Sequence, residues 1–220
     1  MQIHLSEHFT YGKLLRFTFP TIVMLIFTSI YGVVDGVFVS NFAGKTAFAA
    51  VNLIMPALMI FATVGFMLGA GGSAVVARTM GEGDLPRANR YFTLIVLTGV
   101  LAGLVLTAAG LVLVEPLCVL LGAEGEMLPL AVLYRRILTL ALVPFILQNM
   151  LQSFLIVAER PKLGLWLTVA AGLTNMVGDW LLVGVLPWGV AGAAIATVAS
   201  SFVGGVVPLV YFLLPNKSPL

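Results

Sequence analysis

Two aspartates are the residues whose type and setting point most directly to chemistry. Asp35 lies in SIYGVVDGVFVSNF and Asp179 lies in LTNMVGDWLLVGV, so each acid is surrounded by apolar residues. A charged side chain in the centre of a membrane-spanning helix costs about 2.5–3.5 kcal/mol on insertion scales, and acids found there tend to serve ion or substrate pathways. We therefore treat the two carboxyl groups as a candidate site for a small cation.

Polar side chains recur one helical turn from both aspartates. Tyr31 precedes Asp35 by four residues, so the two share a helix face. Asn175 stands in the same relation to Asp179. Oxygen ligands suit a small hard cation, and a carboxyl group in apolar surroundings can instead exchange a proton. Either an H⁺ or Na⁺ site, or a buried polar network that joins three helices, can be formed by Asp35, Asn175, Asp179 and Thr197, the last of which lies on the next apolar segment.

Two amides lie on another apolar segment. Asn149 and Gln152 occur in LVPFILQNMLQSF, where they could line a substrate cavity or pair between helices. The sequence contains no Ser-His-Asp set, no Cys-x-x-Cys motif and no glycine-rich loop for phosphate. We therefore expect a protein that is not an enzyme and that needs no cofactor beyond a coupling cation.

The composition indicates that these segments lie in a lipid bilayer. Of the 220 residues, 60% are hydrophobic and only 9% are charged, whereas ordinary soluble domains have about 25% charged residues. So few charges cannot cover the surface of a soluble enzyme, and the net charge of +2 gives no reason to expect a nucleic-acid partner. The expected class is an all-α polytopic membrane protein.

Six apolar segments are long enough to cross a bilayer, which takes about 20 residues of helix. They are 17–40, 47–77, 92–114, 130–157, 163–186 and 189–213. Pro20 lies in the first of them, where it removes a backbone hydrogen bond and can bend the helix. We expect a six-helix lobe over residues 1–214, followed by the start of an inter-lobe linker at 215–220.

Counting along these segments places three polar residues at a similar depth. Asp35 lies 18 residues after the start of the first segment and Asp179 lies 16 after the start of the fifth, which is about 27 and 24 Å along helices that run in the same direction. Thr197 lies eight residues into the sixth segment, which runs back, and is therefore about 12 Å from the opposite edge. All three are expected in the half of the membrane that lies away from the chain termini, where they can share one cavity. In the orientation that the basic residues predict, this is the outer half.

Basic residues predict the orientation, because lysine and arginine are enriched in cytoplasmic loops. With six spans, both termini lie on one side together with the second and fourth loops. That side carries Lys13, Arg16, Arg78, Arg87, Arg90, Arg160, Lys162 and Lys217, whereas the other carries Lys45, Arg135 and Arg136. The bias predicts cytoplasmic termini in a multi-pass protein of the inner (plasma) membrane. Arg135 and Arg136 fit this pattern least well, and they either snorkel to the outer interface or mark a helix that starts above the membrane.

Several motifs follow one another in a fixed order. They are Pro20, YGVVDGVFV around Asp35, NLIMPALMIFATVGFMLGAGGSAVVARTMGEGD, LQSFLIVAERPK, TNMVGDWLLV and GVAGAAIATVAS. Each piece is weak alone, whereas the ordered set resembles the N-terminal half of a multidrug and toxic compound extrusion (MATE) transporter over essentially the whole chain.

The resemblance implies one lobe of a twelve-helix, two-lobe transporter that exports cationic and amphipathic small molecules against inward H⁺ or Na⁺. It assigns the coupling cation to Asp35, Asn175, Asp179 and Thr197. It also implies that Tyr31, Asn149 and Gln152 line the substrate cavity and that the first helix bends at Pro20. A complete family member is about twice this length, so the second six-helix lobe would belong to a missing C-terminal half or to a partner chain.

The nearest alternative is a lipid-linked oligosaccharide flippase of the same superfamily. Its cavity would be expected to carry several basic residues for pyrophosphate, and the six segments have no Lys or Arg at mid-span. A membrane-embedded enzyme would need a nucleophile–base pair or a metal set, and a structural scaffold would not need buried acids. We therefore interpret the chain as half of an antiporter that works by alternating access.

Overall fold

The computed structural model describes residues 11–214, so the predicted linker at 215–220, including Lys217, lies outside the described residues. Within residues 11–214 the chain is helical throughout apart from short turns. The elements in chain order are α1 (Tyr11–Phe38), the π-helical turn η1 (Val39–Ala43), α2 (Lys45–Gly81), α3 (Leu85–Val112), α4 (Val114–Leu120), α5 (Met127–Leu140), α6 (Leu142–Val157), α7 (Pro161–Asp179), the π-helical turn η2 (Trp180–Val185) and α8 (Gly189–Leu213).

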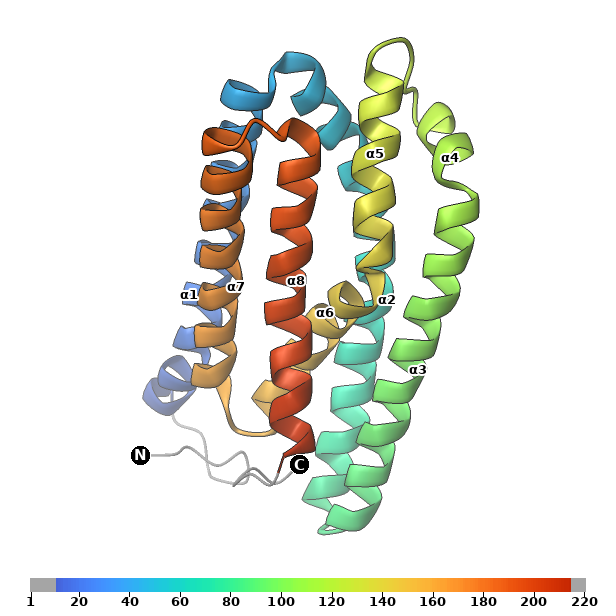
Figure 1. Ribbon diagram of the computed structural model, residues 1–220. Coiled ribbons are helices and arrows are strands. Elements are labelled where there is room, and N and C mark those ends of the chain that lie inside the picture. Colours follow the sequence, from blue (N-terminus) through green and yellow to red (C-terminus); the bar gives the residue numbers. More distant parts are fainter. Residues whose placement is uncertain (1–10, 215–220) are drawn as a thin grey trace.

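The long helices stand side by side in one bundle (Figure 1). Helix α1 packs against α7, α7 against α8, and α2 against α3, while α6 contacts both α2 and α8 and runs obliquely between them. Helix α1 begins and α8 ends at the same end of the bundle, which we call the terminal end. The turns η1 and η2 lie at the opposite end, which we call the η end (Figure 1).

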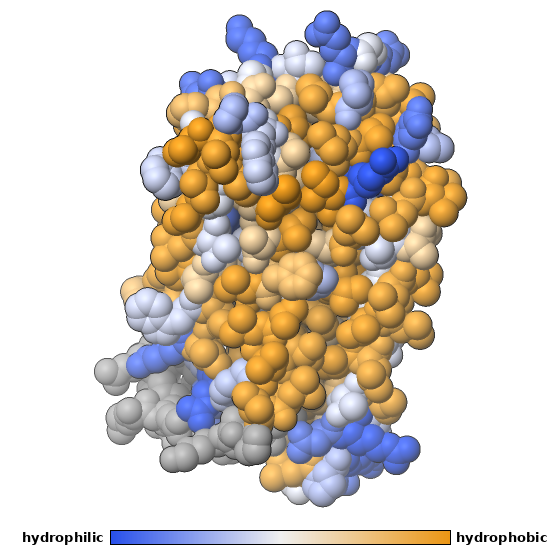
Figure 2. Space-filling model, in the orientation of Figure 1, coloured by the Kyte–Doolittle hydropathy of each residue, from blue (hydrophilic) through white to orange (hydrophobic). Residues whose placement is uncertain are grey.

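Five helical segments are long and apolar enough to cross a membrane. They are Thr18–Ala43, Lys45–Gly81, Leu85–Val112, Pro161–Val185 and Gly189–Leu213. Helices α5 and α6 make a sixth if the bent pair counts as one span. Figure 2 shows a broad band of hydrophobic side chains between hydrophilic ends, as expected for a surface that faces lipid. The expectation of an all-α polytopic membrane protein is confirmed.

The segment predicted as one span at 130–157 is a broken helix. Helix α5 ends at Leu140, α6 begins at Leu142, and the two axes differ by 60°. Pro144 has no N–H group, so it cannot donate to the carbonyl of Leu140 four residues earlier. The Ala141 N–H instead donates to the Leu138 carbonyl at 3.0 Å, which tightens the last turn of α5.

The polar segment 78–90 is mostly helical, although its composition predicts a loop. Helix α2 continues to Gly81 and α3 starts at Leu85, so three residues make the turn. Gly83 adopts a φ of +85°, which suits glycine, and the Asp84 carboxylate accepts a hydrogen bond from the Arg87 N–H at 3.0 Å. A glycine followed by a helix cap lets α2 reverse directly into α3.

Helix α6 lies at the centre of the lobe because its neighbours have glycines where they cross it. A Cβ atom on Gly65 of α2 would lie 2.7 Å from the Ile146 carbonyl oxygen, and one on Gly205 of α8 would overlap the Pro144 carbonyl oxygen. Small residues at such crossings let helix backbones approach closely in a membrane. Both crossings help to hold the bent helix in place.

The two arginines that fitted the charge pattern least well have different surroundings. Arg136 is exposed, whereas Arg135 is 2% exposed. The Arg135 guanidinium carbon lies 5.8 Å from the centroid of the Phe61 ring, and its Nε and Nη1 atoms have no hydrogen-bond partner. Arg135 is therefore stabilised by an aromatic face of α2, and only Arg136 is placed to reach the interface.

Candidate functional site

The two acids come from helices that pack against each other. Asp35 lies near the end of α1 and Asp179 is the last residue of α7, and they are 7% and 0% exposed. Their carboxyl groups lie close enough to interact electrostatically. The structure therefore brings two candidate residues that are 144 positions apart in the sequence into one buried pair.

The backbone widens next to both acids. Helix α7 passes into the π-helical turn η2 at Trp180, directly after Asp179, and α1 passes into η1 at Val39, four residues after Asp35. The two turns also contact each other. Single π-helical turns are frequent at functional sites because they redirect side chains and loosen the backbone ladder locally. At the η end, the backbones of α1 and α7 therefore both depart from regular α-helical geometry next to an acid.

Asn175 and Thr197 extend the acid pair toward α8. The Asn175 amide donates from Nδ2 to Thr197 Oγ1 at 3.5 Å, and the Thr197 hydroxyl donates to the Ala193 carbonyl at 3.0 Å. The Asn175 carbonyl oxygen is buried and has no hydrogen-bond partner. Its amide is thus held by α8 and leaves one oxygen free on the face that also carries Asp179.

Buried oxygens without hydrogen-bond partners gather at this place. They are Asp35 Oδ1, Asn175 Oδ1, Asp179 Oδ1, Asp179 Oδ2 and the Tyr134 hydroxyl. Buried polar atoms in folded proteins are almost always paired, so a cluster of exceptions needs a reason such as an ion or a proton. Carboxylate, amide and hydroxyl oxygens are the ligand types that a small hard cation takes. The predicted residues therefore fit an H⁺ or Na⁺ site.

Tyr134 belongs to this cluster and was missed by the sequence analysis. It is fully buried on α5, its hydroxyl approaches that of Thr197, and it experiences the charge of both carboxylates. A signal was available, because Tyr134 lies four residues into the predicted fourth span, about 6 Å from its outer edge.

Of the three residues predicted to line a substrate cavity, two contact α7 and the third makes a hydrogen bond within its own helix. The Tyr31 ring packs over Gly172 of α7, one turn from Asp35. The Gln152 amide donates to Thr168 of α7 at 3.1 Å. The Asn149 amide donates to the carbonyl of Phe145 in its own helix at 2.8 Å. Tyr31 and Gln152 therefore both contact α7.

Pro20 lies inside α1, which continues through it from Tyr11 to Phe38. It is buried, and the proline ring leaves the Arg16 carbonyl without its usual donor. The position is a weak point in the helix that carries Asp35, close to the terminal end. The assignment of a functional bend to Pro20 remains a prediction.

Comparisons with known proteins agree with this architecture. The family model described as MatE matches residues 20–181. The multidrug export protein MepA of Staphylococcus saprophyticus is 24% identical over 200 residues, which cover 91% of this chain and 44% of the relative. MepA of Staphylococcus aureus is 23% identical over 203 residues, which cover 92% and 45%. The chain spans less than half the length of these curated relatives.

Solved structures show the same fold. A crystal structure of MATE in the bent conformation matches with a TM-score of 0.83 and 27% identity, covering 91% of this chain and 44% of that one. A MOP superfamily transporter from Pyrococcus furiosus matches with a TM-score of 0.88 and 25% identity, covering 97% and 49%. Membership of a transporter family confirms the expectation that the chain is not an enzyme. Because the family model matches well over half of its residues, the chain belongs to the MatE family of membrane transporters.

Proposed function

We propose that this chain is the N-terminal lobe of a cation-coupled antiporter that exports cationic and amphipathic drugs across the inner (plasma) membrane by alternating access. The cluster of buried, unpartnered oxygens around Asp35 and Asp179 carries the proposal. Two carboxylates without a countercharge are costly at membrane depth. A proton or Na⁺ bound between them offsets that cost, so the site favours occupation by the coupling cation.

Coupling follows if the occupied and empty sites favour different arrangements of α1. Asp35 is carried by α1, whereas Asn175 and Asp179 are carried by α7. A cation bound between the carboxylates draws the two helices together, and its loss leaves two like charges that repel each other. Pro20 gives α1 a place to bend in response. The cation shifts the lobe between two states only to the extent that it binds them differently.

Export also requires a second wall for the substrate cleft, which a single six-helix lobe does not supply. The relatives and solved structures extend well beyond the matched region, which makes up 44–49% of their length. We propose that a second six-helix lobe, on the same chain or on a partner, completes the substrate cleft. Tyr31 and Gln152 then contribute the polar contacts on this side, together with Asn149.

The flippase alternative receives less support from the arrangement of charges. A pyrophosphate group calls for several basic side chains in the cavity. Among the arginines whose side chains the structure describes, Arg135 is the buried one, and it packs on Phe61. One of the solved relatives, the Pyrococcus furiosus transporter, is described as having a binding pocket whose reverse polarity suggests a different function. Substrate class therefore has to be argued from the pocket, and the acids here favour cationic substrates.

Cation binding by the purified chain in lipid nanodiscs tests the proposal. Radiolabelled Na⁺ is titrated at fixed pH, and proton uptake is followed by the infrared band of protonated carboxyl groups. We expect one of the two cations to bind, and Asp35→Asn and Asp179→Asn each to lower its affinity by about tenfold or more, because contacts to charged groups contribute about 1.5–3 kcal/mol.

Asp84→Asn is the matched control. Asp84 is an exposed aspartate that caps α3, and asparagine caps a helix equally well. The control variant should bind the cation as the unchanged chain does. Wild-type affinity in both the Asp35 and the Asp179 variants would show that these acids do not form the site.

A further inference from the structure

One face of α8 leads from the cation cluster toward the terminal end. Thr197, Ser201, Gly204 and Pro208 follow one another at intervals of four, three and four residues, so they lie on a single face of the helix. Eleven residues separate the first from the last, which corresponds to about 16 Å along the axis. This face packs against α6, where large side chains would leave no space.

A cavity of about 20 Å³ lies at the upper part of this face, next to the cation cluster. Its walls combine the Thr197 and Ser201 side chains with the break between α5 and α6, and they are Leu58, Leu138, Ala141, Leu142, Phe145, Thr197 and Ser201. The Ser201 hydroxyl donates to the Thr197 carbonyl at 2.9 Å, which leaves its oxygen able to accept. A cavity of about 10–15 Å³ is enough for one water when polar groups line it.

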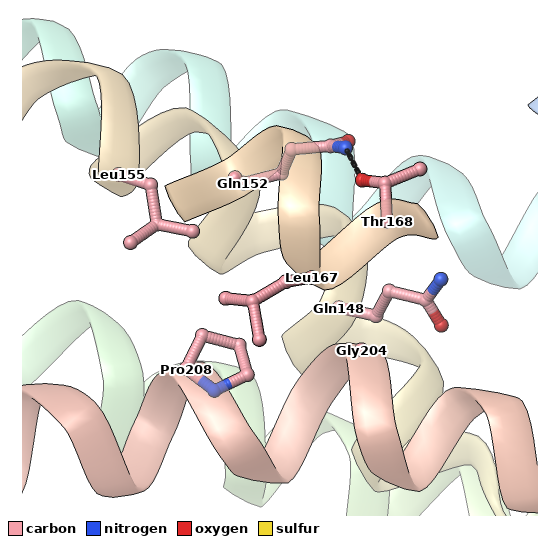
Figure 3. A pocket seen from close by; sticks show the side chains of 8 residues that line it. Gln148, Gln152, Leu155, Leu167, Thr168, Gly204 and Pro208 are labelled. Carbon is pink, nitrogen blue, oxygen red and sulfur yellow. Dashed lines mark hydrogen bonds between the residues drawn. The ribbon is translucent and has the colours of Figure 1, made fainter. Parts of the chain in front are cut away.

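A second cavity of about 20 Å³ lies further toward the terminal end, between α6, α7 and α8 (Figure 3). Its polar walls are Gln148, Gln152 and Thr168, and its floor on α8 is formed by Gly204 and Pro208. Leu155 and Gly164 also line it, and they lie close to the end of α6 and the start of α7. This cavity therefore extends to within about one helical turn of Glu159 and Arg160, which are half-buried at the turn between α6 and α7.

Gln148 lines the second cavity and lies three residues, about one turn of α6, from Phe145, which lines the first. A Cβ atom on Gly204 would be 2.6 Å from Gln148 Cδ, so the glutamine amide lies directly over the glycine. Figure 3 shows this amide beside Gly204, apart from the hydrogen-bonded pair of Gln152 and Thr168. Within residues 11–214 the Gln148 amide has no hydrogen-bond partner, although the residue is half-buried. A half-buried amide of this kind is satisfied by water.

We propose that this face of α8 holds bound waters that conduct protons between the Asp35–Asp179 pair and the terminal end of the lobe, with Gln148 as the residue that positions them. The inference rests on the proposed function, because it needs a carboxyl pair that takes up protons. In each transfer one O–H bond breaks and another forms on the next water, and the last proton reaches a carboxylate. The amide orients the waters on both sides and does not itself take up a proton. Cavities of this size have no room for a hydrated Na⁺ ion, which favours the proton as the ion that is carried.

The test measures how fast the carboxyl pair takes up protons. The purified chain in nanodiscs is subjected to a rapid drop in pH, and the infrared band of protonated carboxyl groups is followed in time and at equilibrium. Gln148→Met keeps the length of the side chain and removes the amide. We expect it to slow proton uptake at least tenfold while the midpoint of the equilibrium titration stays unchanged. A merely structural role would shift the midpoint and the rate together.

Gly204→Ala provides a second variant that does not touch the amide. The added methyl group meets the flexible end of Gln148 and should displace it, so uptake should again slow at an unchanged midpoint. Gly71→Ala is the control, because a Cβ atom there meets nothing within 4 Å. Uptake at the wild-type rate in Gln148→Met and Gly204→Ala overturns the route, as does slow uptake with a shifted midpoint. If Asp35→Asn and Asp179→Asn leave the wild-type band in place, the proposed cation site fails as well, and that result is distinct from a failure of the route alone.

Discussion

The Asn175 amide nitrogen lies 3.5 Å from Thr197 Oγ1, and this contact joins α7 to α8 one turn away from Asp179. It fixes which way the amide points, because the nitrogen is turned to the hydroxyl and the buried oxygen remains free. In the proposed cation site, the carbonyl oxygen would thereby be preorganised before the cation binds. Preorganised ligands bind more tightly because less ordering is required on binding.

Thr197 is expected to contribute through its hydroxyl group. Thr197→Val keeps the shape of the side chain and removes the oxygen, so cation affinity should fall by about three- to tenfold, which corresponds to the roughly 0.5–1.5 kcal/mol that a neutral hydrogen bond contributes. Thr197→Ser retains the hydroxyl and should bind nearly as the wild type does. Titration of the three proteins in nanodiscs checks this, and equal affinity for the valine and serine variants would contradict it.

The crossing of α6 and α8 should be sensitive to a single methyl group. Gly205→Ala places a Cβ atom on the Pro144 carbonyl oxygen, which is backbone and cannot move aside. We expect a loss of about 1–3 kcal/mol in the free energy of unfolding, as for other overpacked sites. Gly71→Ala has open space and should be neutral or stabilising by up to about 1 kcal/mol. Thermal unfolding of both in the same detergent compares them, and equal stability would argue against this close crossing.

The terminal end of the lobe is predicted to face the cytoplasm. Cysteine labelling tests this after Cys118→Ala, because Cys118 is the single cysteine of the chain. Asp84→Cys at the α2–α3 turn should resist an impermeant thiol reagent applied to intact cells and react after permeabilisation. Glu124→Cys, at the other end, should react without permeabilisation. Efficient labelling at position 84 in intact cells would show that the terminal end faces outward, opposite to the predicted orientation.

Depth along a helix could be predicted from the sequence because the rise per residue is fixed. Counting residues placed Asp35, Asp179 and Thr197 at a similar level, and the structure brings the two carboxyl groups together and places the hydroxyl beside Asn175. The six apolar segments could likewise be predicted, because the thickness of a bilayer sets the length of a helix that crosses it. The number of spans and the level of the site thus depend on lengths, which a single sequence contains.

Rotation and bending could not be predicted in the same way. Tyr134 faces the acids only because of how α5 is turned about its axis, and its neighbour Arg135 faces Phe61 instead. The break at Ala141 left no trace in hydropathy, because α5 and α6 are both apolar. Pro144 marked a possible kink, but proline is tolerated in many membrane helices. Both features depend on packing against α2, α4 and α8, which no single segment specifies.

Removing one charge at a time from the acid pair should separate coupling from structure. Asp35→Asn and Asp179→Asn keep the shape of the side chains and replace a carboxylate by a neutral amide, which costs less to bury. If the acids bind the coupling cation, each variant should abolish cation-driven export in the assembled two-lobe transporter while the melting temperature stays the same or rises. If the acids only join helices, the variants should lower stability and leave export per folded molecule unchanged.

These outcomes require both measurements on the same purified protein. Export is followed with ethidium in vesicles under an imposed H⁺ or Na⁺ gradient, and thermal unfolding is recorded on a portion of each preparation. Asp84→Asn again serves as the control, because it removes an exposed carboxylate at the α2–α3 turn and should change neither quantity. Full export by both single variants would remove Asp35 and Asp179 from the mechanism. Loss of export in one variant alone would mean that the coupling cation depends on that carboxylate and that the other acid only shapes its surroundings.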